Sequence, residues 1–122
     1  MPGTTRALRG ATTVEADTPE EVQTKVVSLL SAMLERNGAS HDDLISVLFT
    51  ATDDIHSVFP AAAARSIGLG DVPLICAREL DIVGAKPMCI RVMAHLTTER
   101  TRAELHHVYL EGARDLRDDL PD

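Results

Sequence analysis

The chain has 122 residues, with 12 lysines and arginines against 19 aspartates and glutamates, a formal net charge of −7 at pH 7. An acidic chain with 2% aromatic residues lacks the positive surface and stacking side chains that bind nucleic acids, so this class is excluded. No apolar run approaches the roughly 18 residues of a membrane span, and no apolar signal segment opens the chain, so we expect a cytoplasmic protein.

The composition, with 44% hydrophobic residues, is typical of a globular protein. The length limits it to one domain, residues 1–122, with a flexible C-terminal tail from about residue 111 where charged residues accumulate. Cys76 and Cys89 lack the spacing of a disulfide framework or a zinc site, so we expect two reduced thiols.

The first part of the chain predicts a strand followed by a long helix. Small and β-branched residues favour a strand over Arg6–Thr13. Thr18, Pro19 and Glu21 then have the pattern of a capping box with proline at the first helical position. An apolar stripe of helical spacing carries this helix to Asn37–Gly38, where it should end. The stripe comprises Val22, Val26, Leu29, Leu30, Met33 and Leu34.

The remaining elements are shorter. The apolar run Leu44–Ala51 predicts a strand covered on both faces and central in its sheet. The alanine-rich stretch Ala61–Ile67 predicts a two-turn helix. Val72–Ala77 predicts another short strand, and Pro73 near its start indicates either an edge strand or a proline at the opening of the strand. Met88–Leu96 alternates as a strand with one apolar face, and His106–Leu110 predicts a last strand.

This order of elements predicts an α+β fold, a single mixed β-sheet packed with one long and one short helix. Two helices of these lengths cannot shield five strands on both sides. One face of the sheet should therefore be left poorly covered, which favours oligomerisation through the sheets.

The predicted strands carry two arginines with unusual surroundings. The alternation places Arg91 on a mostly apolar face, where a permanent positive charge needs an anion: either Glu79 in an internal ion pair or a bound anionic ligand. Arg9 lies between Ala7 and Ala11, small residues that leave room beside its side chain, although a solvated strand face is equally compatible with this pattern.

Motifs for other chemistries are absent from the sequence. The five histidines show no metal-ligand spacing, and His106 and His107 should point to opposite faces of their strand, so no metal is predicted. The sequence has no phosphate-binding loop, dinucleotide fingerprint or nucleophile elbow, so no cofactor is predicted either. Cys76 has no evident histidine partner and is best explained as a packed thiol.

Several stretches, in order and over nearly the whole chain, resemble the small monofunctional bacterial chorismate mutases of the trimeric α/β-barrel class. They are RGATTVEADTPEE (9–21), ATDDIHSVFPAAAAR (51–65), VPLICARELDIVG (72–84), CIRVMAHL (89–96) and HVYLEGARDLRDDL (107–120).

The resemblance implies a homotrimeric pseudo-α/β-barrel with active sites in the clefts between subunits. It implies an isomerase that converts chorismate to prephenate, on the shikimate-pathway branch toward phenylalanine and tyrosine, without a cofactor. An intramolecular rearrangement transfers no proton and needs no nucleophile, which agrees with the missing catalytic motifs. Such a catalyst must hold a flexible dianion in its reactive conformer and stabilise charge that separates as the ether bond breaks.

The resemblance also implies roles for individual residues. Arg91 matches the arginine that donates to the ether oxygen, and Arg9 the arginine that holds the enolpyruvyl carboxylate with help from Tyr109. Glu79 and Cys76 match the pair that meets the ring hydroxyl. The positions that match cleft-lining residues are Phe59, Ala61, Arg65 and Leu116, with Arg65 toward the ring carboxylate, and Arg117 falls in the tail that closes over the site.

Two positions depart from the family pattern: Ala62 replaces a frequent lysine and Ile75 a small hydroxyl residue, which could weaken substrate capture. Two alternatives stay open. A small imine deaminase of similar architecture would need a water-activating group, and none stands out. A non-catalytic anion-binding or metabolite-sensing trimer could keep the arginines but need not keep Glu79 or Tyr109.

Overall fold

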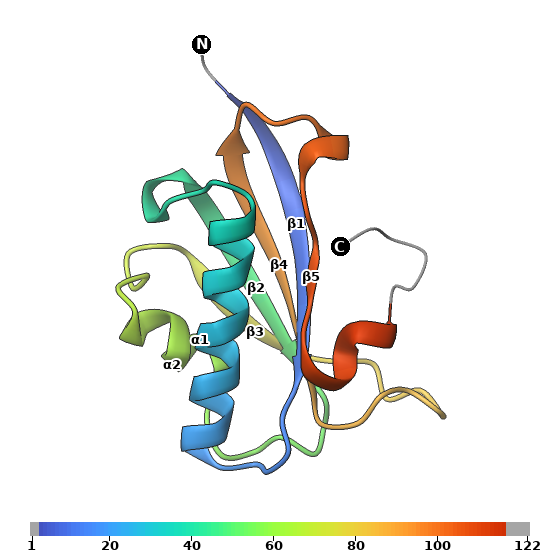
Figure 1. Cartoon of the computed structure of the whole chain (residues 1–122). Coiled ribbons are helices and arrows are strands. Elements are labelled where there is room, and N and C mark those ends of the chain that lie inside the picture. The colour runs from blue at the N-terminus through green and yellow to red at the C-terminus, as the bar shows by residue number, and fades with distance from the viewer. Residues whose placement is uncertain (1–2, 117–122) are drawn as a thin grey trace.

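The computed structural model describes residues 3–116 as one five-stranded mixed sheet with two α-helices on one side (Figure 1). The strands lie in the order β3-β2-β4-β1-β5. Their bounds are β1 Thr4–Thr13, β2 Leu44–Ala51, β3 Leu74–Arg78, β4 Cys89–Thr98 and β5 Val108–Tyr109, and the helices are α1 Pro19–Arg36 and α2 Pro60–Ser66. The predicted α+β fold with a long and a short helix is confirmed.

Helix α1 begins and ends where its sequence signals lie. Thr18 Oγ1 accepts the backbone N–H of Glu21 at 3.2 Å, but the Glu21 carboxylate accepts the N–H of Glu15 instead of that of Thr18. The capping box is therefore only half formed, because the backbone N–H of Thr18 donates to the carbonyl of Ala16 at 3.0 Å. Asn37 caps the C-terminus, and Gly38 follows with φ of +60°, a backbone conformation that favours glycine.

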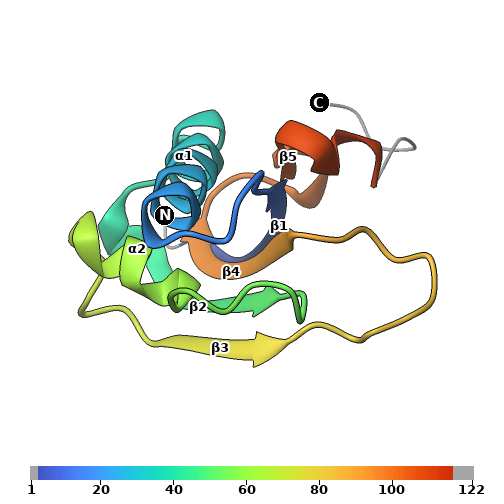
Figure 2. The ribbon, with the colours of Figure 1, turned by 90° about the horizontal axis from the view of Figure 1, so that it is seen from below.

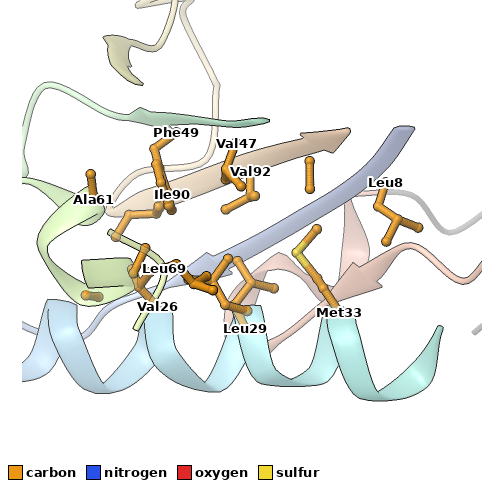
Figure 3. Packing of buried hydrophobic residues seen from close by; sticks show 14 of the residues in the cluster. Leu8, Val26, Leu29, Met33, Val47, Phe49, Ala61, Leu69, Ile90 and Val92 are labelled. Atoms are coloured by element: carbon orange, nitrogen blue, oxygen red, sulfur yellow. The ribbon is translucent and has the colours of Figure 1, made fainter. Parts of the chain in front are cut away.

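The core lies between α1, α2 and one face of the sheet (Figure 3). Phe49 of β2 and Ile90 of β4 are completely buried there. The helix approaches β1 closely: a Cβ added to Gly10 would lie 2.5 Å from Met33 Sδ. Glycine at this position is therefore what allows α1 to pack directly on the strand.

Neither helix α1 nor helix α2 covers the opposite face of the sheet, which we call the bare face (Figure 2), although Ala113 and Leu116 pack on Ala11 and Cys89 at one end of it. Leu48 of β2 and Ile75 of β3 are 37% and 64% exposed on this face. The prediction that Leu44–Ala51 is covered on both faces is thus wrong for the single chain, in which α1 and α2 cover only one side. Strand β2 lies between β3 and β4, so it is an interior strand as predicted, although β4 is the middle strand of the five, and β3 lies at the edge of the sheet.

The last strand is shorter than predicted. Of His106–Leu110 only Val108–Tyr109 pairs with β1, in parallel. The side-chain amide of Asn37 makes two hydrogen bonds with the backbone of His106: it accepts the N–H at 2.7 Å and donates to the carbonyl at 2.9 Å. These two hydrogen bonds join the end of α1 to the segment before β5 and remove His106 from strand pairing.

The segment after β5 begins with a 3-10 helix, Glu111–Asp115, in which Ala113 is fully buried and Gly112 donates its N–H to Thr13 Oγ1 at 2.9 Å. The flexible tail from about residue 111 stays a prediction, and its second half, residues 117–122, lies outside the described residues. Neither helix between residues 3 and 116 has the length and hydropathy needed to cross a membrane.

Candidate active site

Arg91 lies on the bare face, near the start of the middle strand β4. The strand register places it in one row of side chains across the sheet, between Thr50 of β2 and Ala11 of β1, with Tyr109 of β5 beyond Ala11. Ala11 contributes only a methyl group to this row, and it lines the same cavity as Arg91 and Tyr109. The alternation predicted for β4 is confirmed, since Ile90 is completely buried on the opposite face.

Glu79 holds Arg91 from the end of β3. Its Oε2 lies 3.2 Å from Arg91 Nε, and the two side chains are 22% and 40% exposed. The N–H of Arg91 Nε is not aimed at this oxygen, so the contact is an ion pair without a hydrogen bond. Thr50 Oγ1 donates to the same Glu79 oxygen at 2.6 Å. Thr50 thus fixes the carboxylate that faces Arg91, and sequence reasoning missed it.

Four of the residues expected in the site line one cavity of about 220 Å³ on the bare face: Arg9, Glu79, Arg91 and Tyr109. Arg9 pairs in register with Met93, which makes it a diagonal neighbour of Arg91 on the adjacent strand, about 7–8 Å away by the usual spacing of such positions. The backbone N–H of Arg9 is held by His107 Nδ1 at 2.9 Å. Two arginines, a carboxylate and a phenol therefore converge on one space.

Phe59 and Cys76 lie elsewhere. They line a larger cavity of about 870 Å³ beside β3, together with residues of the 51–60 segment. Cys76 pairs in register with the buried Phe49, so it faces the helix side of the sheet, away from Arg91. The structure thus does not bring Cys76 together with Glu79 in one cavity of a single chain.

An ion pair borders this larger cavity. Arg78 donates two hydrogen bonds to Asp53, from Nε to Oδ1 at 3.0 Å and from Nη2 to Oδ2 at 2.7 Å. The hydrogen bonding from Arg78 lowers the pKa of Asp53 below its ordinary value. Both residues are exposed, so solvent weakens the interaction between their charges.

The other expected site residues are dispersed. Ala61 is buried in the core at the start of α2, while Arg65 is exposed in the last turn of that helix. Leu116 packs against the cluster of Ala11, Cys89 and Ala113, as Tyr109 also does. Arg117 lies outside the described residues. Of the two departures, Ala62 is partly buried on α2 and Ile75 is exposed.

The site offers charge and hydrogen bonds but no nucleophile with an activating base. Cys76 and Cys89 are free thiols, and burial raises the pKa of Cys89. Among residues 3–116 no three histidine, cysteine or acidic side chains come together to hold a metal. The arrangement can bind an anion and stabilise negative charge that develops beside Arg91.

Thr50 was missed because its role depends on a partner 29 positions away. Within the predicted strand Leu44–Ala51, Thr50 is indistinguishable from an ordinary β-branched strand residue. The one available signal was that Thr50 and Ser46 are the polar residues of an otherwise apolar run.

A five-stranded mixed sheet with both helices on one side and an arginine-glutamate pair on the bare face defines an α+β protein whose open face is suited to binding an anion. Residues 5–120 match the family model described as chorismate mutase type I. The chain therefore belongs to the type I chorismate mutases, and the expected membership in this family of isomerases is confirmed.

Individual relatives agree with the family match. Chorismate mutase AroH of Thermus thermophilus is 48% identical over 94% of this chain and 95% of its own length. Chorismate mutase AroH of Bacillus subtilis (strain 168) is 44% identical over 94% of this chain and 91% of its own length. The solved structure of a chorismate mutase from Clostridium thermocellum superposes with a TM-score of 0.88 at 44% identity, covering 89% of this chain and 97% of the other.

Proposed function

We propose that this chain converts chorismate to prephenate by an intramolecular Claisen rearrangement, at the branch toward phenylalanine and tyrosine in the cytoplasm. The observation that carries the proposal is the cavity on the bare face, in which Arg91 is held by Glu79 next to Arg9 and Tyr109. The family membership and the full-length similarity to chorismate mutases support the same reaction.

The reaction breaks the ether C–O bond and forms a C–C bond within one molecule. No proton is transferred, but negative charge grows on the ether oxygen as the bond breaks. Glu79 engages the Nε side of Arg91, which leaves the terminal nitrogens of the guanidinium for that oxygen. A donor fixed before the reaction stabilises the transition state without reorganisation, which is the largest contribution expected from such a site.

Arg9 and Tyr109 orient the substrate. The side chain of Arg9 makes no ion pair within residues 3–116, so its forked donors are available to a carboxylate of the dianion. The Tyr109 hydroxyl assists at the same carboxylate, and Glu79 accepts the ring hydroxyl, with Cys76 as its companion. Holding the substrate in its compact conformer removes most of the entropic cost of the rearrangement.

We propose further that three chains form a homotrimer with the active sites between subunits. Phe59, Arg65 and Cys76 lie on the helix side of the sheet or at its edge, whereas Arg91 lies on the bare face. One substrate molecule can contact both groups only if they come from different subunits. Burying Leu48 and Ile75 of the bare face would also stabilise the assembly.

The reaction is tested by incubating the purified protein with chorismate and following its ultraviolet absorbance and the formation of prephenate. We expect turnover without added metal or cofactor, inhibition by a transition-state analogue, and a saturated rate that is flat around neutral pH. A bell-shaped pH dependence of the saturated rate would indicate acid-base chemistry and contradict the mechanism.

The shared site is tested with two variants that we expect to be inactive, Arg91→Ala and Arg65→Ala. Each variant removes one of the two arginines that, in this proposal, come to one active site from different subunits. If each site takes one residue from each of two neighbours, mixed trimers from equal amounts of both regain roughly a quarter of the wild-type sites. Activity that stays at the level of the separate variants, although mixed trimers form, would show that one chain supplies the whole site.

A further inference from the structure

A second cavity, of about 340 Å³, lies beside the catalytic one and has a strongly basic lining. It forms along the part of β1 that β5 does not pair with, where the chain carrying the 3-10 helix Arg102–Glu104 runs beside the strand (Figure 1). The positively charged or titratable residues that line it are Arg6, Arg9, His95, Arg102 and His107, and no aspartate or glutamate is among the lining residues.

This concentration of positive charge runs against the composition of the chain, which has 19 acidic residues against 12 lysines and arginines. None of the three arginines makes an ion pair within residues 3–116. Glu104 is the acidic residue nearest to Arg102 in the sequence, but its carboxylate accepts the backbone N–H of Thr101 at 2.8 Å and so caps the 3-10 helix Arg102–Glu104. Like charges gathered without a counterion repel each other, so an anion is the missing partner.

The buried part of Arg6 points the same way. Its Nε is shielded from solvent and has no hydrogen-bond partner in the described chain. A buried N–H without an acceptor is costly, and such a group in a native structure indicates a partner that has not yet been identified.

We propose that this cavity is a second anion site, separate from the catalytic cavity, which takes a small ligand with two or more negative charges on oxygen, as in a phosphate ester or a polycarboxylate. Arg6 and Arg102 bind the anion from β1 and from the 3-10 helix, across the cavity. Met93 and Leu105, which also line it, provide apolar contact for the ligand's carbon skeleton. The volume suits a small metabolite.

The two cavities share Arg9 and Met93. An anion in the second cavity attracts the Arg9 guanidinium away from the substrate carboxylate that it binds in the proposed function. The occupied site therefore raises the KM for chorismate while leaving kcat, which depends on Arg91, nearly unchanged. This kinetic consequence rests on the proposed function, whereas binding of the anion does not.

Binding is tested by calorimetric titration of the assembled protein at constant ionic strength, with inorganic pyrophosphate and citrate as separate probes. Arg102→Gln removes an exposed lining residue, Arg91→Ala alters the catalytic cavity, and Arg36→Gln removes the same charge from the exposed end of α1 as the matched control. We expect Arg102→Gln to weaken binding about tenfold or more, because it loses a charge-assisted contact, while the other two variants bind as the wild type does.

The comparison of the two probes shows whether phosphate or carboxylate oxygens are preferred, and binding of either supports the site. Absence of binding to the wild-type protein would overturn the proposal, as expected if a carboxylate of a second copy fills the cavity. Weaker binding in Arg91→Ala would place the anion in the catalytic cavity instead. An equal loss of affinity in all three variants would show that they act through the overall charge of the protein, and it would overturn the proposed site.

Discussion

Strand β4 presents Ile90 to the helices on one face of the sheet and Arg91 to the bare face on the other, and the two faces differ in what their residues do. On the covered face the side chains are apolar and interlocked with α1, so their contribution is to stability. On the bare face a charged pair remains partly exposed, which costs stability but keeps donors available for a substrate. Substitutions on the two faces should therefore separate folding from catalysis.

Phe49→Ala should have the largest effect, and it should act on stability. The side chain is completely buried between β2 and the helices, so its removal leaves a cavity in the core. We expect the free energy of unfolding to fall by about 3–5 kcal/mol, measured by denaturant titration at constant protein concentration. A loss below about 1 kcal/mol would show that this face is not the main source of stability.

Arg91→Ala should have the converse effect. Removing the donor aimed at the ether oxygen should lower the first-order rate by about 10² to 10³ or more, by analogy with a lost oxyanion-hole donor. The unfolding free energy should change little, because the side chain is 40% exposed. Arg91→Lys is the matched variant: it keeps the charge but not the forked geometry, so it should also be severely impaired. Near-normal turnover in either variant would contradict the assigned role.

Thr50→Val should have a smaller effect, through Glu79. The substitution keeps the shape of the side chain and removes the 2.6 Å hydrogen bond that fixes the carboxylate facing Arg91. We expect kcat to fall about tenfold, since hydrogen bonds to charged groups contribute about 1.5–3 kcal/mol, with little change in unfolding. Thr50→Ser retains the hydroxyl and should keep most of the activity. Equal losses in the two variants would show that packing, not the hydroxyl, explains the effect.

The sequence predicted the covered face better than the bare one, for a physical reason. Helix α1 begins after Thr18 and ends at Asn37, and both residues cap it through contacts with residues a few positions away. Such local signals can be recognised in the sequence. The Arg91–Glu79 pair was predicted as one of two options because a strand arginine needs an anion. Two hydrogen bonds could not be predicted from the sequence. The Glu21 carboxylate accepts the N–H of Glu15 instead of that of Thr18. Asn37 binds the backbone of His106, which is distant in the sequence, and this contact shortens β5.

The separation of site residues between two cavities was also out of reach, because it depends on strand order. Cys76 and Glu79 lie three positions apart in the sequence and were expected to act together. The register of β3 with β2 turns Cys76 to the side of Phe49, while Glu79 reaches Thr50 and Arg91 on the other side. Proximity in sequence therefore did not imply a shared cavity in one chain.

The smallest effect is expected from Asp53, which lies on neither face but at the rim of the larger cavity. Hydrogen bonds from Arg78 lower its pKa in the folded protein below the ordinary value of 3.8, so its contribution to stability is complete above that value and is lost as the pH falls through the folded pKa. Asp53→Asn should therefore be slightly less stable than the wild type at neutral pH, with the difference shrinking below about pH 4. Unfolding free energies of the two proteins along a pH series measure this, with Asp42→Asn as a control, since Asp42 is exposed and makes no ion pair within residues 3–116. A difference that stays constant into acid would mean that the pair does not stabilise the folded chain through its charge.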